Sequence, residues 1–572
     1  MGVLPGRSTR PGALAEEARR ATLRWNVAII RDVLSVVLVG CYAPLSQLTL
    51  SPVYGSIPAS LYHSPVVALV VALAGVIHFL TPFRRMLSVH LGTSLPVICM
   101  WIPTLQSFMF IWSSSMGGTA GPLVTELFTY FPLLLVAALL ALERLDGLGL
   151  EEVFGRASVV PVILVFTVVR NVSKLSAKML LPLLGLSSHL TRSSLQLYVA
   201  GVFAVLSPSK LLVLALPSLV YSLLYNVHMP FATTTTSLQQ ALAASAGYEL
   251  LARQDSLTGY ISVLDSHTDG FRVMRCDHSL LGGNWLRYPD GTKPSSLVAE
   301  PIYAIFSMLE AVRLVERGGV GGIVEGESPR RDAETALVIG LGVGTSPNAL
   351  IRHGINTTIV EIDPVVHDYA TRFFGLSPRH TSVIGDAVQF VDRARRSQSR
   401  FDYIIHDVFT GGAEPVDLFT FEFLSGLRDL LQPNGAIAMN YAGDVAAPSA
   451  RLVVRTILAV FPTCRIFREG HEPDTSSKYL DFTNMVLFCT KAATPLRFRS
   501  PVEADFLGSL SRRQHLVPRY EIDATIFGDV AGDDDVLRKD STERLTRWQE
   551  KSALGHWKIM RKVLPDAVWV NW

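Results

Sequence analysis

Charged residues are scarce in the first part of this 572-residue chain. Residues 27–229 hold only 16 Asp, Glu, Lys and Arg, and residues 33–83 and 86–125 hold none. A helix needs roughly 20 apolar residues to cross the ~30 Å hydrocarbon core of a bilayer. The uncharged runs therefore exclude a purely soluble or disordered chain. They predict an all-α transmembrane bundle of about six to eight helices at 27–229, with the lipid bilayer as a partner.

Eight apolar stretches are candidates for these spans, and some of them are short for a bilayer. They are Val33–Leu50, Ser64–Leu80, Leu91–Trp112, Leu127–Leu142, Val159–Val169, Met179–Leu190, Leu195–Leu206 and Leu211–Val227. The positive-inside rule places the basic tail at 1–26 in the cytosol, because this tail is rich in arginine. An even number of spans then returns the C-terminal half of the chain to the cytosol.

Cysteine is also scarce, and no two of the five cysteines are close in sequence (Cys41, Cys99, Cys276, Cys464 and Cys489). This spacing argues against a disulfide framework and against a zinc site. It favours a reduced compartment, so we predict a multi-pass membrane protein with a cytosolic catalytic domain and no metal. The net charge of only +2 argues against a nucleic-acid partner.

Beyond Met229 the sequence becomes that of a soluble protein. The region 230–330 reads as a junction with a small antiparallel β element, formed by Gly259–Leu264 and Phe271–Cys276. A linker helix at Pro301–Val315 and a polar linker at 316–331 follow.

Residues 331–495 alternate short apolar strands with helices. The predicted strands are Ala336–Ile339, Thr357–Val360, Ser382–Ile384, Phe401–Ile405 and Ala436–Met439. This order predicts an α/β fold with a parallel sheet covered by helices on both faces, and ligands bind such sheets at the carboxyl ends of the strands. Residues 496–572 form a charged C-terminal extension with no predicted role.

Three glycines and two acids stand at the predicted strand ends. Gly340, Gly342 and Gly344 follow the first strand, in a turn where the backbone approaches a ligand closely. Glu361 ends the second strand, where a ribose diol needs a bidentate acceptor. Asp386 follows the third strand, where an adenine amino group needs an acceptor. Acids at these positions also cap helices, but the ordered set favours a nucleoside site.

These and neighbouring motifs resemble the spermidine synthase family, the polyamine aminopropyltransferases. The motifs are Gln254-Asp255, Gly259–Leu264, Leu337–Gly344, Glu361-Ile-Asp363, Gly385-Asp386-Ala387 and Phe401–Asp407. The resemblance covers roughly 251–490 and implies a methyltransferase-type Rossmann sheet with a small N-terminal β element. The same fold serves adenosylmethionine methyltransferases, so the resemblance specifies the fold better than the reaction.

The resemblance also implies roles for individual residues. Glu361 is expected to bind the ribose of an adenosyl sulfonium donor, and Asp386 with Ala387 its adenine. Gln254 is expected near the donor and Tyr303 at the acceptor substrate. Asp407 is expected to help remove a proton from the attacking amine.

Three positions depart from the family pattern. Val343 stands where spermidine synthases carry an aspartate that recognises the aminopropyl amine. Thr410 replaces the second acid of their catalytic loop, and Ala304 replaces a polar residue after the helix tyrosine. Each departure removes a polar contact for an amine.

The main prediction is a membrane-bound transferase that moves an aminopropyl group from decarboxylated S-adenosylmethionine to a polyamine-like amine. An S-adenosylmethionine-dependent methyltransferase stays open as the alternative. A non-catalytic sensor of adenosyl ligands or polyamines, coupled to the membrane bundle, is a third reading. A homodimer is left open.

Overall fold

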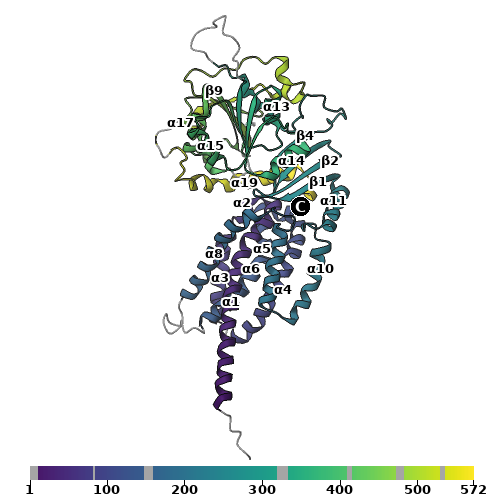
Figure 1. Ribbon diagram of the computed structural model, residues 1–572, viewed down its shortest axis with the longest axis vertical. Coiled ribbons are helices and arrows are strands. Elements are labelled where there is room, and N and C mark those ends of the chain that lie inside the picture. Colours follow the sequence, from purple (N-terminus) through teal and green to yellow (C-terminus); the bar gives the residue numbers. More distant parts are fainter. Residues whose placement is uncertain are drawn as a thin grey trace, which may run out of the picture. The chain divides into compact units, whose positions relative to one another are not determined.

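The computed structural model describes most of the chain, and Figure 1 draws it as a ribbon. The described residues are 11–80, 84–146, 159–317, 333–408, 415–471, 482–528, 532 and 535–572. The chain divides into two compact units. Unit 1 comprises Met1–Thr49, Tyr62–Ser115 and Ala120–Thr235, and unit 2 comprises Leu50–Leu61, Met116–Thr119 and Thr236–Trp572. Most of the predicted linker at 316–331 and Thr410 lie outside the described residues.

Unit 1 consists of helices rich in apolar residues. They are α1 (Pro11–Tyr54, whose end belongs to unit 2), α3 (His63–Leu80), α4 (Arg84–Ile111), α5 (Ser113–Phe128), α6 (Tyr130–Asp146), α8 (Val160–Leu180), α9 (Arg192–Leu206) and α10 (Leu216–Leu224). Large apolar side chains also point outward: Leu69 is 65% exposed, Leu80 76% and Val205 80%. An apolar exterior of this kind suits an apolar surrounding better than water.

Within the described residues, four helices are long and apolar enough to cross a membrane. A fifth span results if α5 and α6, which bend by 45° at their junction, are counted as one. The predicted range of about six to eight is higher, because α9 and α10 fall below the length of a span. Residues 179–190 form no helix of their own, since α8 ends at Leu180 and only a short 3₁₀ turn (Leu181–Leu183) follows.

Two buried carboxylates of unit 1, Glu126 and Asp32, have polar or charged partners. Glu126 lies 2.8 Å from Nδ1 of His63 and accepts a hydrogen bond from Ser46 Oγ at 2.8 Å. Asp32 accepts a hydrogen bond from Arg144 Nε at 2.5 Å. Burial of a charge is costly unless a partner compensates it, so these contacts explain how a core this apolar tolerates carboxylates.

Unit 2 begins with a four-stranded antiparallel sheet in the order β1-β2-β3-β4. Its strands are β1 (Tyr248–Asp255), β2 (Tyr260–Ser266), β3 (Phe271–Cys276) and β4 (Ser279–Trp285). β2 and β3 confirm the two predicted strands. Ile261 and Val263 of β2 pack into one core cluster with Val366 and Tyr369 of the helix α14 (Pro364–Phe374), so the small sheet covers part of the larger fold.

The larger sheet of unit 2 has eight strands in the order β12-β10-β11-β9-β8-β5-β6-β7. They are β5 (Thr335–Ile339), β6 (Asn356–Glu361), β7 (Thr381–Ile384), β8 (Phe401–His406), β9 (Leu431–Asp444), β10 (Thr463–Arg468), β11 (Phe482–Thr490) and β12 (Tyr520–Ile522). Strands β7, β6, β5, β8 and β9 run parallel, while β11 runs antiparallel between β9 and β10. This is the α/β methyltransferase-type sheet that the sequence predicts.

Helices cover both faces of this sheet, as the alternation of side chains along β5 demonstrates. Leu337 and Ile339 pack into one core cluster, with α15 (Ala387–Arg396), α16 (Phe421–Leu430) and α17 (Pro448–Val460). Ala336 and Val338 point to the other face and pack with α12 (Ala304–Leu309) and α13 (Thr345–Arg352). Figure 1 shows the labelled helices on either side of the strands.

A disulfide links Cys464 of β10 to Cys489 of β11. The two cysteines are direct partners in the antiparallel register of these strands, although 25 residues separate them in sequence. The prediction of a chain without disulfides is therefore wrong. Sequence spacing missed the bridge because the strand pairing, and not proximity along the chain, brings the two thiols together.

The C-terminal residues complete unit 2. β12 extends the large sheet beside β10. The last helices are α18 (Leu510–His515), α19 (Glu543–Val563) and α20 (Asp566–Val570). Trp557 of α19 and Trp569 of α20 are buried and lie against the ring of His278, which follows β3.

Candidate active site

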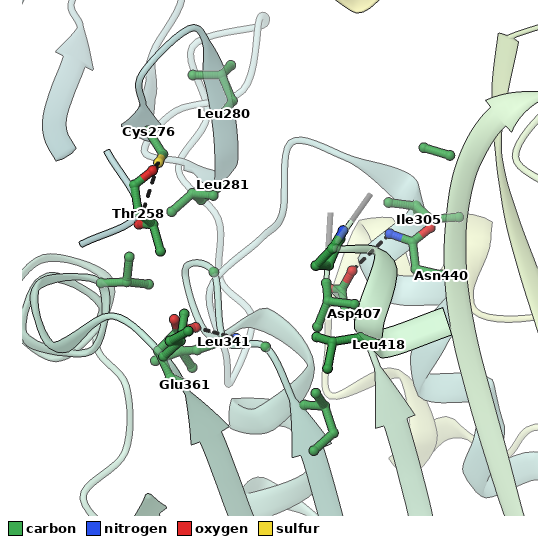
Figure 2. A pocket seen from close by; sticks show the side chains of 18 of the residues that line it. Thr258, Cys276, Leu280, Leu281, Ile305, Leu341, Glu361, Asp407, Leu418 and Asn440 are labelled. Atoms are coloured by element: carbon green, nitrogen blue, oxygen red, sulfur yellow. Dashed lines mark hydrogen bonds between the residues drawn. The ribbon is translucent and has the colours of Figure 1, made fainter. Parts of the chain in front are cut away.

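A cavity of about 650 Å³ lies at the carboxyl ends of the parallel strands in unit 2. Its lining includes Gly340 after β5, Glu361 at the end of β6, Asp386 after β7, Asp407 after β8 and Asn440 in β9. The volume falls within the range of small-molecule pockets. Figure 2 shows the carboxyl groups of Glu361 and Asp407 in separate parts of this cavity. The cavity is thus at the sheet edge where the sequence predicts it.

The glycine turn after β5 is held too tightly for side chains. Gly340 has φ +86°, and a Cβ there would lie 2.0 Å from the carbonyl oxygen of Asp407. A Cβ on Gly342 would lie 2.6 Å from the carbonyl oxygen of Leu281. Gly340 and Gly342 line the cavity, whereas Gly344 caps the N-terminus of α13 in a left-handed conformation. The turn therefore packs directly against the loop of Asp407 at the wall of the cavity.

Glu361 is buried at the end of β6, and backbone amides orient its carboxyl group. Oε2 accepts a hydrogen bond from Leu341 N at 3.0 Å, and Oε1 accepts one from Asp363 N at 2.9 Å. Burial raises the pKa of Glu361 to about 7, and these backbone hydrogen bonds offset part of that rise. Each oxygen has a second lone pair, so the group suits a pair of ribose hydroxyls.

Asp386 and Ala387 line the cavity at the start of α15. Asp386 Oδ1 accepts a hydrogen bond from Val388 N at 2.8 Å and so caps this helix. The second carboxylate oxygen leaves acceptor capacity for a ligand amine. Capping and ligand binding, which the sequence offers as alternatives, are thus compatible at this residue.

Asp407 follows β8, and its carboxyl group is held by one side-chain amide. Asn440 Nδ2 donates a hydrogen bond to Asp407 Oδ1 at 2.9 Å (Figure 2). Burial raises the pKa of Asp407 to about 6, and the hydrogen bond from Asn440 partly offsets the rise. Because the group titrates near neutrality, it can take up a proton during a reaction at physiological pH. The neighbouring His406 points the other way and packs against Phe419.

Of the two remaining predicted site residues, Tyr303 lies in the cavity wall and Gln254 does not. Tyr303 lines the cavity, and burial, followed by the charge of Glu469, raises its pKa to about 12. Gln254 is exposed on β1 and is not among the residues that line the cavity.

Two groups in the cavity wall have no counterpart in the sequence prediction. Glu469 follows β10, and four side chains come from α19 (His556, Ile559, Met560 and Val563). Glu469 was missed because β10 was not predicted as a strand, so nothing in the sequence marked Glu469 as an acid at a strand end. The contribution of α19 lies in the extension that had no predicted role, where the amphipathic pattern alone gives no indication of a ligand.

Two of the departures from the spermidine synthase pattern have a structural explanation. Val343 is buried in an apolar cluster, and a Cβ on Gly282 of β4 would lie 2.8 Å from its Cγ2. Ala304 begins α12 and offers no polar group. Apolar side chains thus stand at two positions where the spermidine synthase pattern has an acid or another polar residue. Among the residues that the structure describes, no group of three or more His, Cys, Asp and Glu side chains could hold a metal ion.

Comparison with known proteins matches the two units differently. Residues 324–446 match the spermine/spermidine synthase domain family. The chain is 46% identical over 553 residues to an N-terminal histidine N-methyltransferase of Emericella nidulans, which covers 94% of this chain and 96% of that protein. A polyamine aminopropyltransferase of Vibrio vulnificus is 39% identical over 111 residues, or 19% of this chain and 37% of that protein. A spermidine synthase structure from Thermotoga maritima aligns with TM-score 0.31 and 18% identity over 43% of this chain and 74% of that one.

These matches correct the main functional prediction. The relative that aligns over both units is a methyltransferase by name, while the aminopropyltransferase match is confined to 111 residues. Aminopropyl transfer to a polyamine is therefore the wrong reaction, and decarboxylated S-adenosylmethionine is not supported as donor. The comparisons support a transferase that uses S-adenosylmethionine. The prediction failed because the nucleoside-binding motifs are common to both reactions.

Proposed function

This chain belongs to the family of the N-terminal histidine N-methyltransferase of Emericella nidulans, and from that premise we propose that it methylates a nitrogen of an N-terminal histidine. The acceptor is then a peptide or protein, and the donor is S-adenosylmethionine. One observation carries the proposal: 46% identity extends over 553 residues, or 94% of the chain, and so includes parts of both units. The cavity supports it, because acids suited to a nucleoside and to a proton lie in separate parts of one pocket.

The donor end of the cavity suits the nucleoside of S-adenosylmethionine. We expect Glu361 to accept hydrogen bonds from the ribose hydroxyls and Asp386 with Ala387 to bind the adenine, because all three residues line the cavity. Gly340 and Gly342 line the cavity beside these acids, and their backbone, which carries no side chain, is expected to approach the rest of the donor. The bound donor supplies a methyl group on a sulfonium, so the protein has little bond activation to perform.

The work left to the chain is to present a neutral nitrogen in line with that methyl group and to accept a proton. The nitrogen forms a bond to the methyl carbon while the carbon–sulfur bond breaks, and the product nitrogen is a cation until it loses a proton. Asp407 is the group placed to take that proton, and Asn440 holds its carboxylate in orientation.

The titration of the acceptor favours the imidazole ring over the α-amino group as the nucleophile. An imidazole has an ordinary pKa of about 6.5, whereas an α-amino group has one of about 7.7–8.0 and is more often protonated at pH 7. Asp407, with a pKa of about 6, is well matched to the ring. The proposed reaction is therefore methylation of the ring of an N-terminal histidine.

We also propose that unit 1 is embedded in a lipid bilayer. Its long apolar helices and apolar exterior support this. The prediction of a cytosolic catalytic unit had two grounds, an even number of spans and reduced cysteines, and the Cys464–Cys489 disulfide removes the second. Disulfides persist mainly in oxidising compartments. The bridge supports the placement of unit 2 on the non-cytosolic side of the membrane.

The proposal is tested with the full-length chain, purified in detergent and mixed with S-adenosylmethionine and a peptide that begins with histidine. Mass spectrometry is expected to detect one added methyl group on the first residue, and none on a peptide whose only histidine is internal. D407N is expected to lower turnover by about 10²-fold or more with little change in donor affinity. Methylation that ignores the position of histidine, or full turnover by D407N, contradicts the proposal.

A further inference from the structure

The polar groups of the cavity follow the order of the strands. The groups suited to the donor stand on β7, β6 and β5, where Asp386, Glu361 and Gly340 lie. Beyond them the order continues through β8, β9, β11 and β10. Asp407 stands at the end of β8, and Glu469 follows the end of β10. The acceptor half of the cavity is therefore bounded by two carboxyl groups with different surroundings.

Glu469 is fixed by its neighbour across the strand pair. Asn484 of β11 donates from Nδ2 to Glu469 Oε2 at 3.1 Å, and Glu469 N donates to the carbonyl of Asn484 at 3.3 Å. The side chain is half-buried in the cavity wall and, in the described part of the chain, makes no ion pair. A carboxylate held in this way is an anion presented to whatever enters the cavity.

Tyr303 supplies a second polar group in the same cavity wall. The residue lines the cavity, and its hydroxyl is buried and has no hydrogen-bond partner among the described residues. Tyr303 and Glu469 line the same cavity, and the charge of Glu469 adds to the effect of burial in raising the pKa of this hydroxyl. A buried hydroxyl without a partner is costly, so a ligand that supplies a donor would be bound favourably there.

We propose that Glu469, with the Tyr303 hydroxyl of the same cavity wall, binds the free α-ammonium group of the acceptor and thereby selects an N-terminal histidine over an internal one. The assignment rests on the proposed function. An α-ammonium group offers a positive charge and three N–H donors, of which the carboxylate and the hydroxyl take two. An internal histidine presents a neutral amide instead and cannot satisfy both acceptors.

The dimensions of the sheet agree with this arrangement. Three strand spacings separate β8 from β10 in the order β8-β9-β11-β10, or about 14 Å. A histidine spans about 6 Å from its ring nitrogens to its α-nitrogen. Two hydrogen bonds of about 2.8 Å, to Asp407 and Glu469, leave a remainder that their side chains cover. The register places Asn440, the partner of Asp407, level with Phe467 of β10, and Glu469 follows two residues or about 7 Å farther along. For one histidine to contact both carboxyl groups, the two side chains must also bridge this offset.

The test compares three peptides that differ only at the first residue, with the full-length chain in detergent. One has a free N-terminal histidine, one has it Nα-acetylated, and one has the histidine replaced by its desamino analogue. The wild-type chain is expected to prefer the free amine. E469Q should lower kcat/KM for the free-amine peptide by about 10- to 100-fold and leave that for the desamino peptide within about 2-fold. E469D should retain part of the preference, because it retains the charge.

E521Q is the matched control, since Glu521 on β12 pairs with Arg465 outside the cavity. It should leave the preference intact. Equal losses on both peptides by E469Q would assign Glu469 a merely structural role and overturn the inference, as would no loss at all. A loss of preference in D417N instead would transfer the role to the exposed acid at Asp417, which also lines the cavity. If wild type methylates none of the peptides, the proposed function itself fails, and the inference fails with it.

Discussion

Glu361 and Asp407 both have pKa values close to neutrality, and burial is the main cause in each case. The pKa is about 7 for Glu361 and about 6 for Asp407. A carboxyl group whose pKa is higher in the folded than in the unfolded state makes the fold less stable as pH rises toward the folded value. Burial of Glu361 and Asp407 in the cavity thus lowers the folding stability at neutral pH, and perturbed pKa values of this kind are typical of functional sites.

Donor binding should consequently depend on pH through Glu361. Ribose hydroxyls donate to the ionised carboxylate, so affinity for S-adenosylmethionine is expected to increase between pH 6 and pH 8, as Glu361 loses its proton near pH 7. E361Q should weaken binding at pH 8 by ~1–3 kcal/mol and remove most of this increase. Calorimetry across the pH range measures both effects. An unchanged pH profile in E361Q would reject the ribose role.

Among individual residues, the sequence predicts those proposed to bind the donor better than those proposed to bind the acceptor. Glu361 and Asp386 follow recognisable strands at fixed order, so the topology of the fold alone places them. Glu469 depends on the pairing of β10 with β11, which a single sequence does not reveal. Gln254 was placed by resemblance only, and the structure leaves it exposed.

Among the elements, the glycine turn after β5 is the most constrained. The backbone of Gly340 lies against the carbonyl of Asp407, so any side chain there would displace the loop that carries this acid. Gly375, the cap of α14, has a similar positive φ of +68° but no atoms within 4 Å of a Cβ. Substitution of Gly375 by alanine therefore tests the strain of the backbone conformation alone, whereas substitution of Gly340 tests that strain together with the close contact to Asp407.

G340A is expected to lower affinity for S-adenosylmethionine by about 10- to 100-fold, because overpacking costs about 1–3 kcal/mol in addition to the strain of a left-handed alanine. G375A should cost about 1–2 kcal/mol of stability through that strain alone and bind the donor normally. Thermal unfolding and calorimetry of the detergent-purified chain measure the two terms. Equal donor affinity in both variants would show that the contact with Asp407 does not matter.

Elements with a regular apolar pattern were predictable, and those defined by tertiary context were not. The strands from β5 to β9 stand where the sequence places them, because buried parallel strands are short apolar runs. The stretch at 179–190 is equally apolar, yet Pro182 and Gly185 interrupt it and no span forms. α19 is amphipathic, but only the folded chain places its apolar face in the cavity wall.

For the whole molecule, the apolar helices of unit 1 and the disulfide of unit 2 lead to a joint expectation. The chain should stay in the membrane pellet after high salt and alkaline carbonate, and detergent should release it.

If intact cells are treated with a membrane-permeant alkylating agent before lysis, Cys464 and Cys489 should be recovered as a linked pair, while Cys276 should be recovered as a free thiol. Release by salt would contradict the membrane assignment, and alkylated Cys464 would contradict the oxidising compartment.

The contact between Gly340 and the Asp407 carbonyl has a consequence for how this scaffold can change its chemistry. Main-chain atoms, which no substitution deletes, hold the glycine turn against the loop that carries Asp407. Side chains on the outer strands can then change without moving this turn and this loop apart. A common architecture can in this way serve both polyamine synthesis and the modification of polypeptide ends.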